Sequence, residues 1–384
     1  MTSKKMAIFT GSDIRALGGG RYMMELSNRL TKFKTTIFST QEEEKIRISH
    51  KEVKKLTTSD IVYYKAPKFP ITQENMVVSY SGFKALLSLR DFDVIYNTDS
   101  SLLTNIQLIM LSKIFGKRLI FAMHDAGTLR RNPIKRTAIK SMFIELYNHG
   151  KYWVLRRVPN IHVLNLSDKN ELFRIGYDKN IYHIPNFLYY DINEREVANN
   201  QKEFIALFVG RLDIEQKGID LFGEIIEKVL KENRNIRFRI IAPKDNGYSI
   251  IRALINKYPR NIKLIGYVTS QRLRREYKRS SLFVLTSRTE GMPAVLLEAQ
   301  SLGTPAVAFN IKGVNDVLAS ESQGRLIDNF DTNKFSDAIL KYYKRWKSDR
   351  KAYMDRKRQI AKKIKETYSD KIIVPKLEKI LNNE

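Results

Sequence analysis

The chain has 384 residues, of which 43% are hydrophobic and 28% are charged. This length predicts about two domains with ordinary apolar cores, and it excludes wholesale disorder. The chain has no cysteine, which excludes disulfide scaffolds, Cys-ligated zinc and thiol catalysis. Its 68 Lys and Arg against 41 Asp and Glu give a net charge of +27, so polyanionic partners are expected.

No segment of the sequence predicts a membrane span. The most apolar stretch, residues 102–115, is interrupted by Thr104, Asn105 and Gln107, whereas a spanning helix needs about 18 apolar residues in a row. The apolar run near the start of the sequence is too short for a signal peptide. With the lack of cysteine, this predicts a cytoplasmic protein that meets a membrane only peripherally, on the cytosolic face.

Short apolar, β-branched runs alternate with segments of helix length along most of the chain. Several runs are apolar without alternation, as in strands that are buried on both faces. The pattern predicts an α/β protein with parallel sheets covered by helices. The predicted strands are Met6–Phe9, Thr35–Phe38, Val94–Tyr96, Leu119–Ala122, Ile161–Leu164, Ile181–Ile184, Phe204–Val209, Ile236–Ile241, Ile262–Ile265, Leu282–Leu285 and Ala306–Phe309.

A polar stretch, residues 189–203, separates the two halves of this pattern. It predicts two Rossmann-like domains, residues 1–190 and 191–384, which face each other across a cleft. The last helix can pack back on the first domain. In open parallel sheets, ligands bind beyond the carboxyl ends of the strands, so the loops there are the first candidates for a site.

The strongest local signal is the segment 287–309, SRTEGMPAVLLEAQSLGTPAVAF. A predicted strand leads into a loop with Glu290 and Gly291, and Pro293 is predicted at the first position of a helix that carries Glu298. The free N–H groups at the start of a helix form a site for an anion. The two carboxylates can therefore contact different parts of one extended ligand, although both are also common as plain helix and loop residues.

A second signal is the segment 204–218, FIALFVGRLDIEQKG. A buried strand ends at Gly210, and Arg211 and Lys217 follow in the loop. Two cations at the carboxyl end of a strand suit a diphosphate, with Arg as a fork and Lys as a point charge. In a chain this basic, plain surface charge is the alternative.

The third signal, MAIFTGSDIRALGGGR at residues 6–21, places Gly19 and Gly20 at the start of a helix after a strand. Backbone N–H groups of such a loop can hold a phosphate, but the spacing matches neither GxGxxG nor a Walker A loop. A fourth, LIFAMHDAG at 119–127, delivers His124 and Asp125 to the end of a strand. This pair suits general acid–base chemistry or hydrogen bonds to hydroxyls.

The sequence indicates no dedicated metal site. No second His stands at ligand spacing from His124, and HExxH is absent. The segment Asp91–Asp93 matches DxD in form, but it precedes a strand and is predicted to be an entry loop.

Basic charge concentrates in two stretches that also contain aromatic residues. Residues 130–157 hold eight Lys or Arg against Glu145, with Trp153 among the aromatics. Residues 341–365 hold twelve Lys or Arg against two Asp. Such stretches suit an anionic membrane surface, which is predicted as a partner, or else they are solvated helix faces whose aromatic rings pack inward.

These segments, in this order, resemble the retaining glycosyltransferases of family 4, also called glycosyltransferase group 1, which have the GT-B fold. The resemblance extends over nearly the whole chain and is most specific in the Glu290–Glu298 spacing, which matches the family's E-x(7)-E motif. VGRLDIEQKG is similar to the family's diphosphate loop, the segment at His124 to its strand-end HD element, and the segment at Asn186 to its IPN element.

The resemblance implies a role for each matching residue. Arg211 and Lys217 would hold the donor diphosphate, and Gly19 and Gly20 would approach it from the other domain. The donor would be a nucleoside-diphosphate sugar, acting as a substrate. Neither a cofactor nor a metal is implied, because Arg, Lys and the helix dipole neutralise the leaving group.

Around the transferred sugar, Glu290 would bind near the reaction centre and His124 would contact hydroxyls and stabilise positive charge. Glu298 would bind the ribose hydroxyls of the donor. The lining implied for the sugar and phosphates consists of Gly291, Met292 and Pro293. The acceptor would be a hydroxyl of a glycan or a lipid, including a lipid-linked glycan at a membrane surface.

Three other classes stay open at this stage. A nucleic-acid-binding protein would explain the net charge, but the sequence has no helix-turn-helix, zinc-finger or RNA-recognition signature, so no specific nucleic acid is expected. A GT-B-like nucleotide-sugar epimerase would use the same donor loops without an acceptor. A non-catalytic partner subunit would keep the pocket, but intact Glu290 and His124 argue against it.

Overall fold

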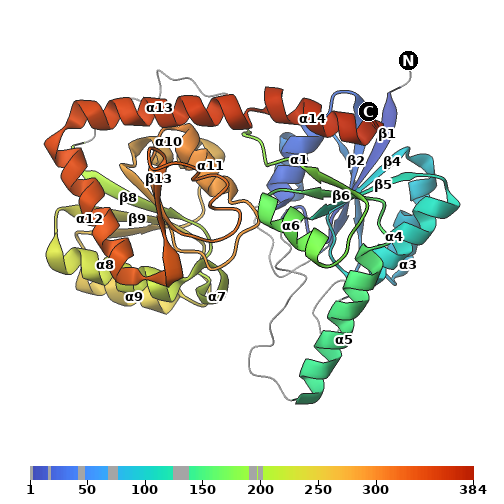
Figure 1. The fold of residues 1–384 in the computed structure, drawn as a ribbon, viewed down its shortest axis with the longest axis horizontal. Coiled ribbons are helices and arrows are strands. Elements are labelled where there is room, and N and C mark those ends of the chain that lie inside the picture. The colour runs from blue at the N-terminus through green and yellow to red at the C-terminus, as the bar shows by residue number, and fades with distance from the viewer. Residues whose placement is uncertain are drawn as a thin grey trace. The chain divides into compact units, whose positions relative to one another are not determined.

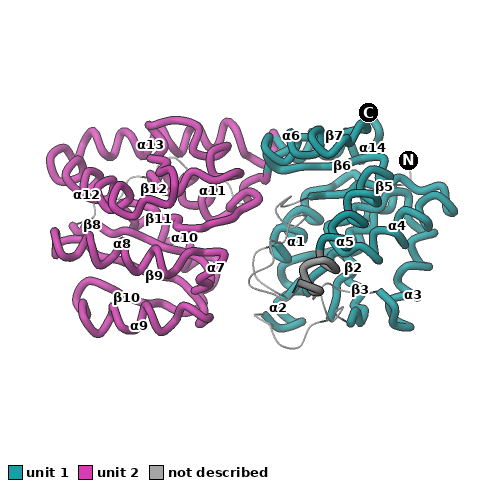
Figure 2. Tube along the Cα trace, turned by 60° about the horizontal axis from the view of Figure 1, so that its bottom comes forward, with its two compact units in different colours: residues 1–185, 373–384 teal, residues 186–372 magenta. Residues whose placement is uncertain are grey.

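The computed structural model of the protein describes residues 3–15, 19–41, 48–67, 77–123, 138–189, 197 and 202–384, with the backbone alone for 138–144. The chain divides into two compact units (Figure 2). Unit 1 comprises residues 1–185 and 373–384, and unit 2 comprises residues 186–372. The predicted boundary after residue 190 lies outside the described residues.

Unit 1 is built on a seven-stranded sheet in the order β3-β2-β1-β4-β5-β6-β7 (Figure 1). All its paired strands are parallel. The central strand β4 is buried along its whole length, as the apolar run at the start of its sequence VIYN requires. The strands are β1 (Lys4–Phe9), β2 (Phe33–Thr40), β3 (Asp60–Tyr64), β4 (Val94–Asn97), β5 (Arg118–Met123), β6 (Asn160–Val163) and β7 (Asn180–His183).

Helices connect the strands of unit 1, and several begin at a capping side chain. Ser49 and Glu52 form a capping box, and Ser79 accepts a hydrogen bond from Gly82 N. The helices are α1 (Gly19–Arg29), α2 (His50–Leu56), α3 (Tyr80–Ser88), η1 (Leu89–Asp91), α4 (Leu102–Ile114), α5 (Ala138–Leu155), α6 (Leu166–Arg174) and, from the end of the chain, α14 (Asp370–Asn382). The guanidinium of Arg118 on β5 donates to the carbonyl of Ile380 at 2.7 Å, so α14 is tied to this sheet.

Unit 2 contains a six-stranded parallel sheet in the order β10-β9-β8-β11-β12-β13. All six residues of β8 are buried, in agreement with the unbroken apolar run FIALFV. The strands are β8 (Phe204–Val209), β9 (Ile236–Ile241), β10 (Ile262–Ile265), β11 (Leu282–Leu285), β12 (Ala306–Phe309) and β13 (Gly324–Ile327).

The aromatic residues of the second basic stretch pack into the core of unit 2. Tyr342, Tyr343, Trp346 and Tyr353 are buried in the cluster that contains Phe204. The stretch is therefore a pair of helices with a solvated basic face and an apolar inner face. The helices of unit 2 are α7 (Ile214–Lys217), α8 (Ile219–Glu232), α9 (Tyr248–Lys257), α10 (Ser270–Arg279), α11 (Ala294–Ser301), η4 (Asp328–Phe330), α12 (Thr332–Ser348) and α13 (Arg350–Tyr368).

Two strands of the structure, β3 and β13, are absent from the sequence prediction. Both lie at an edge of their sheet, where a strand has a partner on one side only. Their sequences, DIVYY and GRLI, mix polar and apolar residues because part of each strand is exposed. An edge strand therefore lacks the continuous apolar run that identifies the central strands.

Each sheet contains one point at which the strand order changes direction. In unit 1 it lies between β1 and β4, and in unit 2 between β8 and β11. Loops diverge at the carboxyl ends of such neighbouring strands, and side chains on them can converge on a ligand. The predicted site residues of unit 2 follow β8 and β11, the two strands at this point.

Candidate functional site

The site in unit 2 is built around an ion pair between the two loops. The Lys217 Nζ atom lies 2.5 Å from Glu290 Oε1, and both side chains are largely buried. Ser287, which follows β11, donates a hydrogen bond to the same oxygen at 2.6 Å. The structure thus brings together a cation from the β8 loop and a carboxylate from the β11 loop, which are 73 residues apart in sequence.

Lys217 is placed by α7, a single helical turn after β8. Asp213 caps this turn by accepting from Gln216 N at 2.5 Å. Arg211 lies at the mouth of the loop, where it donates to Gln216 Oε1 at 2.6 Å and pairs with Asp213 and Asp245, each at 3.5 Å. Its side chain is 45% exposed, so it can turn toward an anion without leaving a buried pair.

Gly218 lets the two loops lie against each other. Its φ is +63°, and a Cβ atom there would lie 2.3 Å from the carbonyl oxygen of Thr286. Thr286 in turn donates its hydroxyl hydrogen to the carbonyl of Lys217 at 2.9 Å. Arg288 completes the contact with a bidentate pair to Asp220 at 2.7 and 2.8 Å, which lowers the pKa of that carboxyl group.

The helix after β11 begins at Ala294, with Pro293 as its N-cap residue. It therefore begins one residue later than predicted. Gly291 and Met292 lie directly before it. Glu298, on the same helix, is buried and accepts a hydrogen bond from the Tyr277 hydroxyl at 2.9 Å. The start of α11 offers N–H groups to an anion next to the Lys217–Glu290 pair.

A further contact fixes the turn before α11. Asn186 is buried, and its side-chain amide donates to the carbonyl of Met292 at 3.1 Å. The IPN match in the sequence names Asn186 but no partner for it, and the sequence gave Ser287 and Tyr277 no role. Ser287 and Tyr277 are ordinary polar residues, and only their contacts with Glu290 and Glu298 distinguish them.

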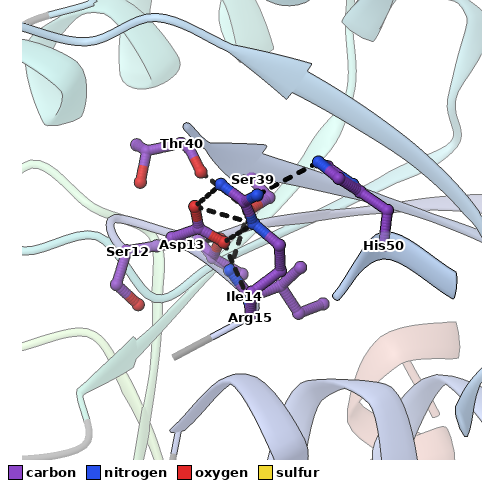
Figure 3. A network of polar contacts seen from close by, with 8 residues as sticks. Ser12, Asp13, Ile14, Arg15, Ser39, Thr40 and His50 are labelled. Atoms are coloured by element: carbon purple, nitrogen blue, oxygen red, sulfur yellow. Dashed lines mark hydrogen bonds and ion pairs between the residues drawn. The ribbon is translucent and has the colours of Figure 1, made fainter. Parts of the chain in front are cut away.

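In unit 1, the carboxyl ends of β1 and β2 hold a buried polar network (Figure 3). The carboxylate of Asp13 pairs with the Arg15 guanidinium at 2.5 Å, and Arg15 Nη1 lies 3.0 Å from His50 Nε2. Because a guanidinium only donates, this nitrogen of His50 is the acceptor. The pair with Asp13 raises the pKa of Arg15. The network fixes the backbone of residues 13–15 after β1.

Those glycines differ in their surroundings. Gly20 is buried, and a Cβ atom there would lie 2.3 Å from the carbonyl oxygen of Ile14, whereas a Cβ atom on Gly19 would meet nothing within 4 Å. His124, the remaining predicted site residue, lies outside the described residues. Within the described part of the chain, no three His, Asp or Glu are grouped so as to hold a metal ion. None of the described helices is long and apolar enough to cross a membrane.

Comparison with known proteins bears on both units. Residues 203–345 match the family model "Glycosyl transferases group 1". The chain is 30% identical over 190 residues, 49% of its length, to a poly(ribitol-phosphate) alpha-N-acetylglucosaminyltransferase of Staphylococcus aureus (strain COL). It is also 30% identical over 155 residues, 39% of its length, to an Escherichia coli UDP-Gal:alpha-D-GlcNAc-diphosphoundecaprenol alpha-1,3-galactosyltransferase. These matches span 35% and 39% of the two relatives' own lengths.

Among solved structures, Anabaena HepE in complex with UDP and glucose superposes with a TM-score of 0.74 at 13% identity. The match covers 98% of this chain and 99% of HepE. Two units on parallel Rossmann-like sheets, together with this likeness, define a GT-B fold. Residues 203–345, which include the Lys217–Glu290 pair, belong to the group 1 glycosyltransferases by this family match.

Proposed function

We propose that the protein transfers a sugar from a nucleoside-diphosphate sugar, with UDP as the nucleotide, to an acceptor hydroxyl with retention of anomeric configuration. The observation that carries this proposal is the largely buried pair of Lys217 and Glu290, which sits between the β8 and β11 loops at the start of α11. A cation and a carboxylate in contact suit a ligand with a negatively charged group bonded to a carbon atom that becomes positive during the reaction. A sugar diphosphate has this distribution of charge in the transition state.

The diphosphate would compete with Glu290 for the Lys217 ammonium group. In the donor complex, Lys217 and the half-exposed Arg211 would then neutralise the phosphates, and the N–H groups that follow Gly291, Met292 and Pro293 would add further donors. Glu290, released from Lys217 and still held by Ser287, would face the sugar near its developing positive charge. Because these groups supply the neutralisation, the reaction would need no metal ion.

The remaining roles are proposed from the resemblance to the family's motifs. Glu298, oriented by Tyr277, would bind the ribose hydroxyls of the nucleotide. Gly19 and Gly20 would contact the diphosphate through their backbone. His124 would bind sugar hydroxyls. The acceptor hydroxyl would attack on the face of the sugar that the diphosphate leaves.

For the acceptor we propose a phosphate-bearing glycan or lipid. The names of both relatives contain such an acceptor, poly(ribitol-phosphate) in one and a diphosphoundecaprenol in the other. A net charge of +27 supports the same class, because a positive field concentrates polyanionic substrates near the protein.

The test of this function is donor turnover by the full chain with saturating UDP-sugar and with chelator present. Replacing Lys217 with Ala should lower turnover by about 10- to 150-fold, since a charged hydrogen bond to phosphate is worth roughly 1.5–3 kcal/mol. The control is Lys231→Ala, which removes the same charge from an exposed pair on α8. Equal turnover in both variants, or activity that only magnesium restores, would contradict the proposal.

A second pair of variants separates the two carboxylates. Glu290→Gln should mainly lower kcat, because it removes a negative charge beside the sugar. Glu298→Gln should mainly raise the KM for the donor, because its proposed partners are unreactive ribose hydroxyls. If both variants changed kcat and KM in the same way, Glu290 and Glu298 would not have the separate roles proposed for them.

A further inference from the structure

Exposed apolar side chains gather on three neighbouring helices of unit 1. Seven large hydrophobic residues on these helices are exposed, from 51% for Phe83 to 86% for Tyr80. We call these seven residues the α3–α5 patch: Tyr80, Phe83 and Leu87 on α3, Met110 and Ile114 on α4, and Leu146 and Trp153 on α5. Isolated exposed apolar residues are common, but a group on adjacent helices indicates an interaction surface.

The spacing within each helix places the patch residues on one outward face. On α3 they are at i, i+3 and i+7, whereas Ala85 and Leu86 on the same helix are buried. On α4 they are at i and i+4, opposite the buried Leu108. The three helices therefore have apolar side chains on both faces. Those on the inner face pack in the core of unit 1, whereas those on the outer face have no such packing in the described structure.

Contacts join the three helices that carry the patch. The Tyr147 hydroxyl on α5 accepts a hydrogen bond from Leu102 N at the start of α4, at 3.2 Å. Gln107 on α4 donates to the carbonyl of Val77, just before α3, at 3.0 Å. In Figure 1, α3, α4 and α5 accordingly follow one another on the same side of unit 1.

The charges on the three helices are mostly positive, although the exposed Asp91 and Asp93 follow directly after α3. Glu145 is the one acid in the sequences of α3, α4 and α5. Lys84 and Lys113 are exposed on α3 and α4, and Arg156 is exposed just after α5. The guanidinium carbon of Arg157 stacks over the Trp153 ring, 3.3 Å from its centroid, so an aromatic ring and a cation are presented together.

We propose that the α3–α5 patch docks on an anionic lipid bilayer. Apolar side chains would enter the boundary between headgroups and acyl chains, Tyr80 and Trp153 would lie at headgroup depth, and the flanking cations would contact lipid phosphates. This proposal rests on the proposed function in one respect: the membrane would present a lipid-linked acceptor to the enzyme. It also differs from the sequence prediction for residues 130–157, since most of the patch lies on α3 and α4.

Two other occupants fit these observations less well. A second copy of the chain would bring a second net charge of +27 toward the same basic rim. A nucleic acid would complement the cations, but seven protruding apolar side chains offer nothing to phosphates. A lipid surface satisfies both the apolar side chains and the charges.

The test is sedimentation of the full chain with phosphatidylcholine vesicles that contain either no or 50% phosphatidylglycerol. The variant Leu87→Ser/Ile114→Ser removes two apolar side chains from the patch, and the control Leu166→Ser/Phe173→Ser removes two of similar exposure from α6. Binding of the wild type should require phosphatidylglycerol and weaken with salt. The patch variant should bind between about tenfold and a hundredfold more weakly, from the apolar area it loses, and the control should bind like the wild type.

Equal loss in both variants, or no loss in the patch variant, would overturn the proposal. So would a dimer in light scattering that the patch variant abolishes, because a second copy would then be the occupant. The thermal shift caused by UDP-sugar is measured in parallel and should be the same in all three proteins. That readout reports the donor site, so a failure of membrane docking and a failure of the proposed function are distinguishable.

Discussion

The two units share a parallel α/β architecture but differ in what they expose. Among the described residues, fourteen large hydrophobic side chains are exposed, twelve in unit 1 and two in unit 2. In unit 2, the ion pairs Lys217–Glu290 and Arg288–Asp220 join the loops after β8 and β11. The two units thus share a fold but differ in how many apolar side chains they expose.

The largest expected effect tests whether the loops of unit 2 must touch. Gly218→Ala places a Cβ atom 2.3 Å from the Thr286 carbonyl at a positive φ, which should cost roughly 2–5 kcal/mol of unfolding free energy. Gly19→Ala in unit 1 is the control, because a Cβ atom there meets nothing within 4 Å, and it should change stability by less than about 1 kcal/mol. Urea unfolding of both variants measures the difference, and equal stabilities would refute the close contact.

The second prediction concerns a buried histidine in unit 1. His162 donates from Nε2 to the carbonyl of Ile184 at 2.7 Å and accepts from the Tyr96 hydroxyl at Nδ1 at 2.8 Å. Burial lowers the pKa of His162 from 6.5 to about 4. The unfolded chain therefore binds a proton first as the pH falls, and unit 1 should lose about 3 kcal/mol of stability between pH 6.5 and pH 4.

Hydrogen exchange at the amides of β6 measures this loss locally. The variant His162→Gln keeps a donor and an acceptor but does not titrate, so its stability should depend less on pH over this range. If the wild type and the variant showed the same dependence, His162 would not be the titrating group.

The third prediction concerns the corresponding feature of unit 2, a buried lysine. Lys357 on α13 donates to the carbonyl of Ser280 at 3.0 Å, and burial lowers its pKa from 10.5 to about 8. Between these two values the unfolded chain binds more protons than the folded chain, so the contribution of Lys357 to stability should improve as the pH rises from 8 to 10.5.

At pH 7 the buried charge is present, and Lys357→Met should stabilise unit 2 by roughly 1–3 kcal/mol. Trp346, buried in unit 2, reports its urea unfolding by fluorescence in a Trp153→Phe background. A destabilised Met variant at pH 7 would mean that the bond to Ser280 outweighs the cost of burial.

The smallest expected effect is that of the half-exposed ion pair Arg288–Asp220. Solvent screens such a pair, so Arg288→Ala should cost at most about 1 kcal/mol, and less at high salt. Arg325→Ala removes a more exposed pair with Glu321 and should cost still less. A loss well above 1 kcal/mol for Arg288→Ala alone would show that this contact, with Gly218, holds the loops together.

The sequence alone determined the central strands and most of the donor-site candidates. Continuous apolar runs such as Phe204–Val209 can only be satisfied by burial on both faces, so they identify central strands without tertiary information. Glu290 and Lys217 follow such strands, and neighbouring parallel strands bring their ends together. The family and its GT-B fold, indicated by these motifs, are confirmed by the comparisons.

Tertiary structure decided what depends on contacts between distant residues. The edge strands β3 and β13 lack a continuous apolar run, and the bond from Ser287 to Glu290 leaves no local pattern, because serine is common on any surface. The contact of Asn186 with Met292 was also decided by the fold, since the IPN match does not name a partner for Asn186. The α3–α5 patch is also invisible in sequence. A leucine that faces solvent, such as Leu87, has the same local pattern as one that faces the core, and only the packing of the helices on the sheet distinguishes the two.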